Sequence, residues 1–447
     1  MCIRLIVLVT VMFSLSATAQ NTIQSPFSSY GFGERATGTD PICSALGNAA
    51  ITYLDSTLVN IHNPASYNLL SEGQPLFSLA VRARISNFEQ AGESNTTGIA
   101  VVDHFAMAFP IRKHFGLAFG LKPFSRRGYE ITEKTLVGTD SLRNTYSGYG
   151  GANEAFIGLT TNLLKLRSTQ FAVGANLGFL FGTAVNERKS SIIDNNSFLG
   201  GVDRKRIRFR SFHYELGFMF RQDFGKKQTL TLTGVLEPSQ QINSFRGETL
   251  FFAGNVNNAQ SYSVLYDTSN VAGYLELAPS YTFGFSYSLR TSSKESNRSR
   301  NSEFLLMGSY SSTDWTQFSS NFNDVTENYG YNATQKISLG FQYSPEYQEY
   351  GVNTNFFESL RYRAGYYTFN LPYTDSGNEI SEIGTTFGIG MPITAQQSLS
   401  SINLGVTLGR RGSGEGDGFN ERFIGINFGI IVAPSNYDRW FRKRKLD

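Results

Sequence analysis

The residue types that most often carry catalysis or bind metals are few in this chain, and they form no arrangement with a known chemistry. The four histidines, His62, His104, His114 and His213, are scattered, and no H-E-x-x-H pair marks a zinc site. No G-x-S-x-G nucleophile turn, Walker loop or dinucleotide fingerprint occurs either. Cys43 has no histidine partner near it in sequence. We therefore expect no enzyme, no metal and no cofactor; the alternative is a catalytic site assembled from residues far apart in sequence.

The composition is typical of a transmembrane barrel rather than of a soluble protein. Of the 447 residues only 17% are charged, whereas soluble proteins have about 25%. Aromatic residues make up 14%, with 37 Phe and 23 Tyr, and there are 44 Gly. Mean hydropathy is nevertheless −0.23, because a barrel combines an apolar lipid face with a polar lumen. The net charge is only +3 and no basic domain stands out in the sequence, so we expect no nucleic-acid partner.

The N-terminus is typical of an export signal. Arg4 precedes a short apolar core, and Ala17-Thr18-Ala19 gives an A-x-A cleavage site, so residues 1–19 are interpreted as a signal peptide. Cys43 is then the only cysteine of the mature chain, and no intramolecular disulfide is expected. No later run is apolar and long enough for a spanning helix. These features predict the outer membrane of a Gram-negative cell.

Period-two alternation predicts the strands. It is clearest in 77–85, 171–182, 214–220, 281–289, 402–408 and 424–430. A soluble sandwich would alternate as well, but the non-apolar face here consists mainly of small residues and the connections alternate in length, as outer-membrane barrels require. Long outer connections are expected near 185–203, 240–276 and 316–329. We predict an all-β, antiparallel transmembrane barrel of about 14 strands over residues 75–432, followed by a basic periplasmic tail, 433–447.

The stretch from Ser25 to Tyr67 precedes the first strand and has no regular period. It contains Gly47-Asn48-Ala49-Ala50, then Asp55, then Asn63-Pro64-Ala65. This order resembles the N-terminal hatch of the FadL-type outer-membrane transport family, which carries long-chain fatty acids and other hydrophobic compounds and includes PorV-like barrels. The resemblance implies that residues 20–74 form a hatch, or plug, in the lumen. Asn63-Pro64 could instead be a simple turn.

The resemblance also implies roles for individual residues. Asn63, Pro64, Ala65, Gly47 and Asp55 would belong to the hatch and take part in gating. The polar backbone of the hatch must find hydrogen bonds, and lumen-facing side chains are candidates to provide them. The alternative is that these lumen charges pair only with each other. The candidates are Arg82, Arg84, Asn176 and Glu215.

Pro123 falls in the third predicted strand, where it removes a ladder donor. The family has a kinked third strand that opens a window toward the lipid. Gly120 and Pro123 occur in the third predicted strand of this chain, at the place that corresponds to the kink. The alternative is that Pro123 marks only the outer end of the strand.

Two functions remain open. The first is passive uptake of a hydrophobic, fatty-acid-like molecule, captured at the outer connections near Leu250-Phe251-Phe252, passed by a hatch shift near Asn63 and released sideways at Pro123. The second is a non-transporting barrel that acts as a structural or binding subunit of an outer-membrane secretion or assembly machine. The expected partners are membrane lipids and lipopolysaccharide, a hydrophobic small molecule, and, for the second function, machinery proteins.

Overall fold

The structure is a computed structural model that describes most of the chain between Ser25 and Ala433. The described ranges are 25–36, 40–70, 74–90, 92–112, 114–138, 140–193, 199–295, 298–346, 355–375, 377–393, 400–413 and 418–433. The expected signal peptide and all but the first residue of the expected basic tail lie outside these ranges.

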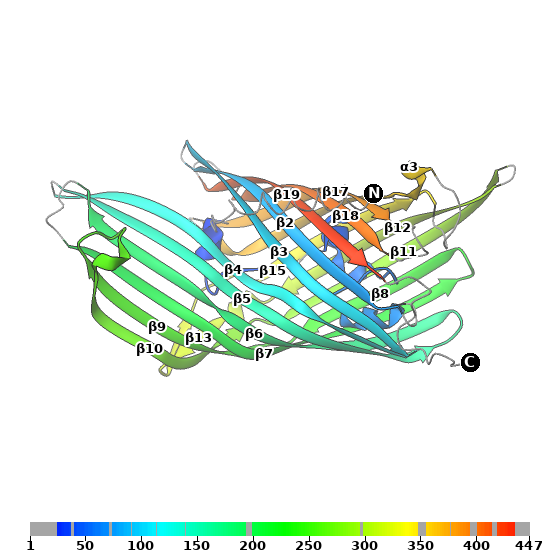
Figure 1. Ribbon diagram of the computed structural model, residues 1–447, viewed down its shortest axis with the longest axis horizontal. Helices are drawn as coiled ribbons and strands as arrows, with labels where there is room; N and C mark the ends of the chain where they lie inside the picture. Colours follow the sequence, from blue (N-terminus) through cyan, green and yellow to red (C-terminus); the bar gives the residue numbers. More distant parts are fainter. Residues whose placement is uncertain are drawn as a thin grey trace, which may run out of the picture.

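The strands form one closed antiparallel barrel of 14 spans, which confirms the predicted fold class (Figure 1). Closure occurs where β19 (Asn420–Val432) runs antiparallel to β2 (Leu76–Gln90), from Asn420 opposite Glu89 to Val432 opposite Phe77. Where the wall is closed it has no free edge, so its backbone groups there are hydrogen-bonded within the wall, as a membrane requires. In the described part of the chain, no helix is both long and apolar enough to cross a membrane.

Ten spans are single strands, and four are interrupted. The single strands after β2 are β3 (Glu93–Arg112), β4 (Phe115–Val137), β5 (Asp140–Lys165), β6 (Thr169–Ile192), β7 (Gly200–Phe224), β16 (Arg361–Asp375), β17 (Asn378–Pro392), β18 (Ser401–Gly412) and β19. The interrupted spans are β8 (Gln228–Glu237) with β9 (Gln240–Ala253), β10 (Tyr262–Leu277) with β11 (Ser280–Glu295), β12 (Arg298–Thr313) with β13 (Ser319–Phe322), and β14 (Val325–Asn328) with β15 (Thr334–Ser344). Pro238 and Pro279 stand at two of the interruptions, where a ladder donor is missing.

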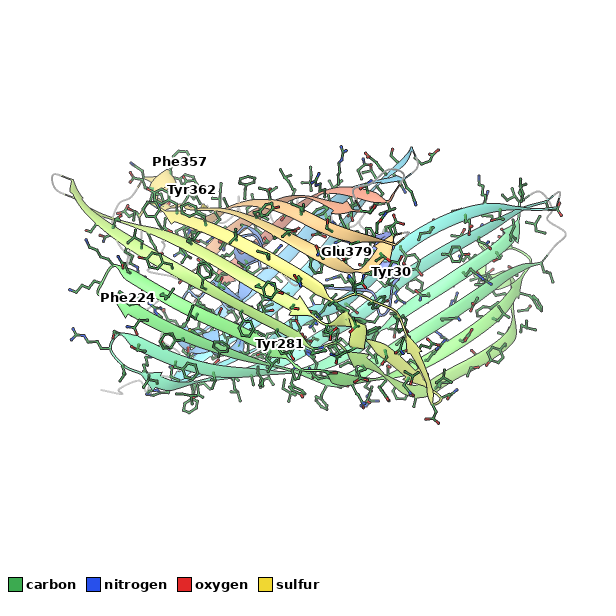
Figure 2. All side chains as sticks on the ribbon, turned by 180° about the vertical axis from the view of Figure 1, so that it is seen from behind. Tyr30, Phe224, Tyr281, Phe357, Tyr362 and Glu379 are labelled. Carbon is green, nitrogen blue, oxygen red and sulfur yellow. The ribbon has the colours of Figure 1, made fainter. Side chains whose placement is uncertain are left out.

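Apolar side chains cover the outside of the wall, as the alternation predicts. Leu177 on β6 and Phe212 on β7 point outward, with 49% and 65% of their surfaces exposed. Tyr281 and Phe224 project outward in the same way (Figure 2). Because this band is continuous around the spans and contains aromatic residues, it is suited to contact with lipid.

Away from the end with short connections, the wall divides into two parts. Pairing between β3 and β4 ends at Phe105 opposite Leu121, although β4 and β5 stay paired up to Val137 opposite Asp140. We call the outer parts of β4 to β7, β9, β10, β13 and β14 the long wall, and β15 to β19 with β2 and β3 the short wall. The long wall extends well past the short wall in Figure 1.

The long wall corrects the expectation of long outer loops. Residues 240–276 form β9 and β10, which pair with each other from Gln240 opposite Leu277 to Ala253 opposite Tyr262. Leu250-Phe251-Phe252 therefore lies in a strand. These strands were missed because, outside the lipid, neither face must be apolar, so the alternation that identifies a strand disappears.

The N-terminal segment, of which residues 25–36 and 40–70 are described, lies inside the barrel (Figure 1). Its described residues form short elements: η2 (Pro26–Ser29), β1 (Glu34–Arg35), α2 (Pro41–Ser44), η3 (Ala50–Thr52) and η4 (Pro64–Leu69). The remaining short elements are η5 (Ala259–Ser261), η6 (Trp315–Gln317) and α3 (Phe356–Ser359). A hydrophobic core forms between the segment and the inner wall, where Leu46, Ile61 and Tyr67 of the segment pack in one cluster with Ala118 and Met307.

Candidate functional site

Asn63, Pro64 and Ala65 meet the inner wall where strand glycines face them. The Asn63 side chain caps η4 by accepting from the Ala65 N–H at 3.0 Å, and its amide nitrogen faces the carbonyls of Ile51 and Phe218 at 3.3 and 3.5 Å. Ala65 is fully buried. A Cβ on Gly217 of β7 would lie 2.8 Å from the Pro64 ring. The motif is therefore fitted against the wall rather than forming an isolated turn.

Gly47 and Asp55 attach the segment to β16 and β17. Gly47 has φ +65° and donates its N–H to Thr386 Oγ1 of β17 at 2.9 Å. Its backbone lies against Gly365 of β16, where a Cβ would collide with it. The Asp55 carboxylate pairs with Arg361 at 3.1 Å. Burial raises the pKa of Asp55, but Arg361 and the hydrogen bonds from Thr57 outweigh it, so the pKa lies below its usual value.

Of the four predicted lumen residues, Asn176 bonds to the segment, and the other three pair within the wall. The Tyr67 hydroxyl donates to Asn176 Oδ1 at 3.1 Å, and Asn176 in turn donates to Glu215 at 2.6 Å. Arg84 instead pairs with Glu421 of β19 at 2.6 Å, and Arg82 lies 4.0 Å from Asp103. The uncharged Asn176 therefore provides a hydrogen bond to the segment, whereas the three charged residues bond to partners in the wall.

Gly120 and Pro123 lie at the point where β4 leaves β3. The last β3–β4 pair is Phe105 with Leu121, and the β4–β5 register shifts between Pro123 and Ser125. Proline cannot donate to a neighbouring strand, so Pro123 is compatible with an unpaired edge there. A window toward the lipid at this point stays a prediction.

A pair of charges in β1 was not predicted, and it connects β8 with β18. Arg35 donates to both carboxylate oxygens of Glu237 on β8, each at 2.6 Å. Glu34 accepts from Arg411 of β18 at 2.7 Å. We call Glu34 and Arg35 the clasp. The only sequence signal was a charged dipeptide within a glycine-rich stretch; the partners are too distant in sequence to identify.

The clasp belongs to a wider network of buried charges. Glu237 also accepts from His213 Nε2 at 2.7 Å, and His213 Nδ1 lies 3.1 Å from Glu154. Because both ring nitrogens face carboxylates, both must donate. Lys122 on β4 lies 3.6 Å from Glu154 and 3.3 Å from Glu215. Sequence reasoning treated His213 as scattered, because β4, β5, β7 and β8 bring these groups together only in the barrel.

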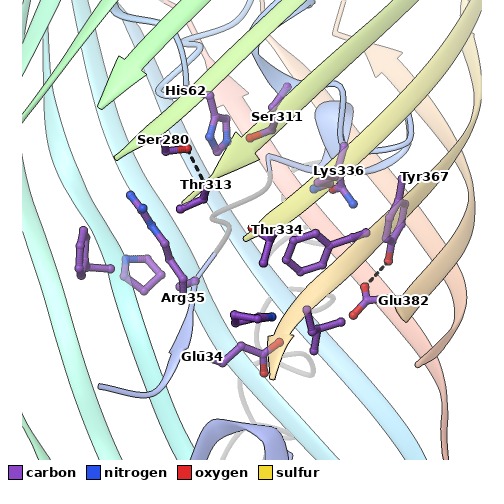
Figure 3. Close-up of a pocket in the computed structure, with 18 of the residues that line it drawn as sticks. Glu34, Arg35, His62, Ser280, Ser311, Thr313, Thr334, Lys336, Tyr367 and Glu382 are labelled. Carbon is purple, nitrogen blue, oxygen red and sulfur yellow. Dashed lines mark hydrogen bonds between the residues drawn. The ribbon is translucent and has the colours of Figure 1, made fainter. Parts of the chain in front are cut away.

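A cavity of about 380 Å³ lies between the segment and the inner wall (Figure 3). Hydroxyls from neighbouring strands line one side, with Thr313 donating to Ser280 at 3.0 Å. On another side Tyr367 donates to Glu382 at 2.7 Å, near Lys336 (Figure 3). Ionisable side chains make up much of the rest: Glu34, Arg35, Arg84, Lys122, Glu154, Glu215, Glu237 and Arg411. In the described residues, no group of three or more His, Cys, Asp or Glu is placed to hold a metal.

Comparison with known proteins agrees with the architecture. A family model described as BamG matches residues 1–447, the whole chain, whereas no curated protein matches. The Pseudomonas putida toluene transporter TodX is 15% identical over 90% of this chain and 99% of its own, with a TM-score of 0.54. The Ralstonia pickettii toluene transporter TbuX is 10% identical over 89% and 98%, with a TM-score of 0.53. A Pseudomonas aeruginosa FadL homologue is 10% identical over 88% and 98%, with a TM-score of 0.52.

At these identities the likeness concerns the fold, which is that of FadL-type outer-membrane barrels. The similar structures are named as transporters or channels and not as enzymes, in agreement with the absence of a catalytic motif. The family model matches from the first residue to the last. The chain belongs to the BamG family, and its fold is that of the FadL-type barrels.

Proposed function

We propose that the chain is a plugged, non-conducting barrel that acts as a structural, partner-binding subunit of an outer-membrane assembly or secretion machine. In this proposal the N-terminal segment stays in place, and surfaces outside the lumen bind partner proteins. The observation that carries it is the clasp, which fastens the segment to β18 through Arg411 and to β8 through Glu237.

Moving the segment would separate charges that are poorly solvated. The side chains of Glu237 and Arg411 are only 7% and 3% exposed. Glu237 would keep His213 and Arg411 would keep Glu382, so the cost is below the about 3–5 kcal/mol of a buried charge left without any partner. A ligand shifts a conformational equilibrium only by the difference in its affinity for the two states, so opening this contact requires a ligand that binds more tightly once the segment has moved.

The charged side chains of the cavity set it apart from an ordinary site for an apolar solute. Sites for apolar ligands are lined mainly by hydrophobic and aromatic side chains with few polar groups. Here acidic and basic residues line part of the space beside aromatic ones such as Trp315. These charges pair with neighbours on the same side of the barrel, Lys122 with Glu215 and Arg411 with Glu382. The family name BamG is consistent with a component of an outer-membrane machine.

Extraction in a mild detergent tests the proposal. We expect stoichiometric partner proteins to purify with the tagged full-length chain, and the purified barrel to show no conductance in planar bilayers. A single species with no partner, together with a steady conductance, would contradict it. The variant Arg35→Gln should retain the partners, because they bind outside the lumen.

The second candidate is the passive channel for hydrophobic molecules, favoured by the separation of β3 and β4 beside Gly120 and Pro123. The route would run from the outer end past a shifted Asn63 and sideways through this gap. The similar solved structures named as toluene transporters support it. In a deletion strain, uptake of radiolabelled long-chain fatty acid and of toluene should then depend on the chain and decrease in Pro123→Val. Unchanged uptake of both would exclude this candidate.

A further inference from the structure

The outer part of β4 has an unpaired edge. One side of β4 is paired with β5 as far as Val137. On its other side, β4 is paired with β3 as far as Leu121 and with the two-residue strand β1 at Ser125 and Arg126. Among the described residues, no further strand pairs with this side. Arg126 reaches across the gap to the Val102 carbonyl of β3 at 2.8 Å. An unpaired edge of this kind is a template for another strand.

The direction of the free backbone groups follows from Gly128. Its N–H donates to Ser28 Oγ at 3.0 Å and its carbonyl accepts from the Ser25 N–H at 3.0 Å, so both point away from β5. In an antiparallel ladder, alternate residues direct both groups to the same side. The register has no shift beyond Ser125, so the backbone groups of Glu130, Thr132 and Lys134 also point to the open side.

The chain itself already uses the lower part of this edge for strand addition. In β1, Glu34 lies opposite Arg126 and Arg35 opposite Ser125, antiparallel to β4. The ladder continues where the Ala36 N–H donates to the Phe124 carbonyl at 3.0 Å. The edge from Tyr129 onward continues the same ladder, and the described residues leave it open.

We propose that β4 from Tyr129 to Leu136 binds an extended segment of a partner polypeptide, which adds to the long wall as an antiparallel strand. This inference rests on the proposed function, because it names the surface through which a machine subunit engages its partner. Strand addition derives its affinity from main-chain hydrogen bonds and its specificity from alternate side chains.

The side chains along the edge indicate which segment fits. Ile131 is 40% exposed on one face, so the partner residue beside it is expected to be apolar or aromatic. Glu130 and Lys134 lie on the other face, and both are exposed. Opposite charges across a strand pair stabilise it. The partner strand should therefore alternate apolar residues with polar ones, carrying a basic residue near Glu130 and an acidic one near Lys134.

The variant Thr132→Pro tests the inference, with Thr132→Val as its matched control. The Thr132 N–H points to the open edge of β4, so proline there removes one free donor and leaves the β4–β5 ladder intact. Valine keeps this N–H. We expect Thr132→Pro to lower recovery of the co-purifying partner about tenfold and Thr132→Val to leave it unchanged. Unheated electrophoresis verifies that both barrels fold.

Hydrogen exchange of the assembly and of the isolated barrel provides the second readout. In the isolated barrel the amides of Glu130, Thr132 and Lys134 should exchange quickly, while those of Ile131 and Glu133, which point to β5, are slow. In the assembly all five should be slow. Equal recovery with Thr132→Pro, or no change in exchange, would overturn the inference while leaving a partner-binding subunit in place. Slow exchange already present in the isolated barrel, or appearing only as its concentration rises, would mean that the chain or a second copy fills the edge, and would also overturn it.

Discussion

Arg35 forms two hydrogen bonds of 2.6 Å with the carboxylate of Glu237, a residue 202 positions later in the sequence. Its neighbour Glu34 binds Arg411, 377 positions away. Successive side chains of a strand point to opposite faces, so two adjacent residues of β1 reach opposite sides of the lumen. This arrangement makes β1 a crosslink between β8 and β18.

The clasp predicts strong coupling between Arg35 and Glu237. Arg35→Gln and Glu237→Gln should each destabilise the N-terminal segment, and a double-mutant cycle should give a coupling energy of about 1–3 kcal/mol. The measurement is urea unfolding in lipid vesicles, together with hydrogen exchange of residues 25–36. Arg422→Gln is the control, since Arg422 is 77% exposed and lies 4.0 Å from Glu89, and exposed pairs contribute little. Additive effects of the two changes would contradict the prediction.

Asn63 has two separable tasks, which two substitutions can distinguish. Asn63→Ser keeps a neutral oxygen that can cap η4 but loses the amide donors facing Ile51 and Phe218. Asn63→Ala loses both, and loss of a cap alone costs about 1 kcal/mol. We expect hydrogen exchange of residues 64–69 to increase modestly in Asn63→Ser and more in Asn63→Ala. Equal increases would mean that the cap contributes nothing.

The barrel could be predicted because membrane spans must alternate, whereas the site depended on pairings between remote strands. The lipid-facing rows of Phe171 to Phe181 and of Ile402 to Leu408 are visible in the sequence and become β6 and β18. Asn63-Pro64-Ala65 was located because the motif is local. The partners of Glu34 and Arg35 were not, since register across a closed barrel sets which residues meet. The long wall was missed because its strands need no apolar face.

Gly217 is predicted to be intolerant of a side chain because the N-terminal segment approaches it closely. A Cβ there would lie 2.5 Å from Asn63 Oδ1 and 2.8 Å from Pro64. Gly217→Ala should displace η4 and increase the exchange of residues 64–69. Gly201→Ala is the matched control in the same strand, because a Cβ there would have no atom within 4 Å. Similar exchange in the two variants would contradict the close fit.

His62 is predicted to make the segment sensitive to acid. Burial, and then the nearby charge of Lys122, lowers the pKa of His62 from 6.5 to about 3; His104 and Lys336 act in the same direction and Asp103 opposes them. The folded state thus favours the neutral ring, so stability is complete above pH 6.5 and declines as the pH falls from there toward 3. His62→Gln should reduce this decline in urea unfolding, and the His62 ring in the folded protein should remain neutral at pH 5 by NMR titration. A ring that titrates near pH 6.5 would show that the lumen does not disfavour its charge.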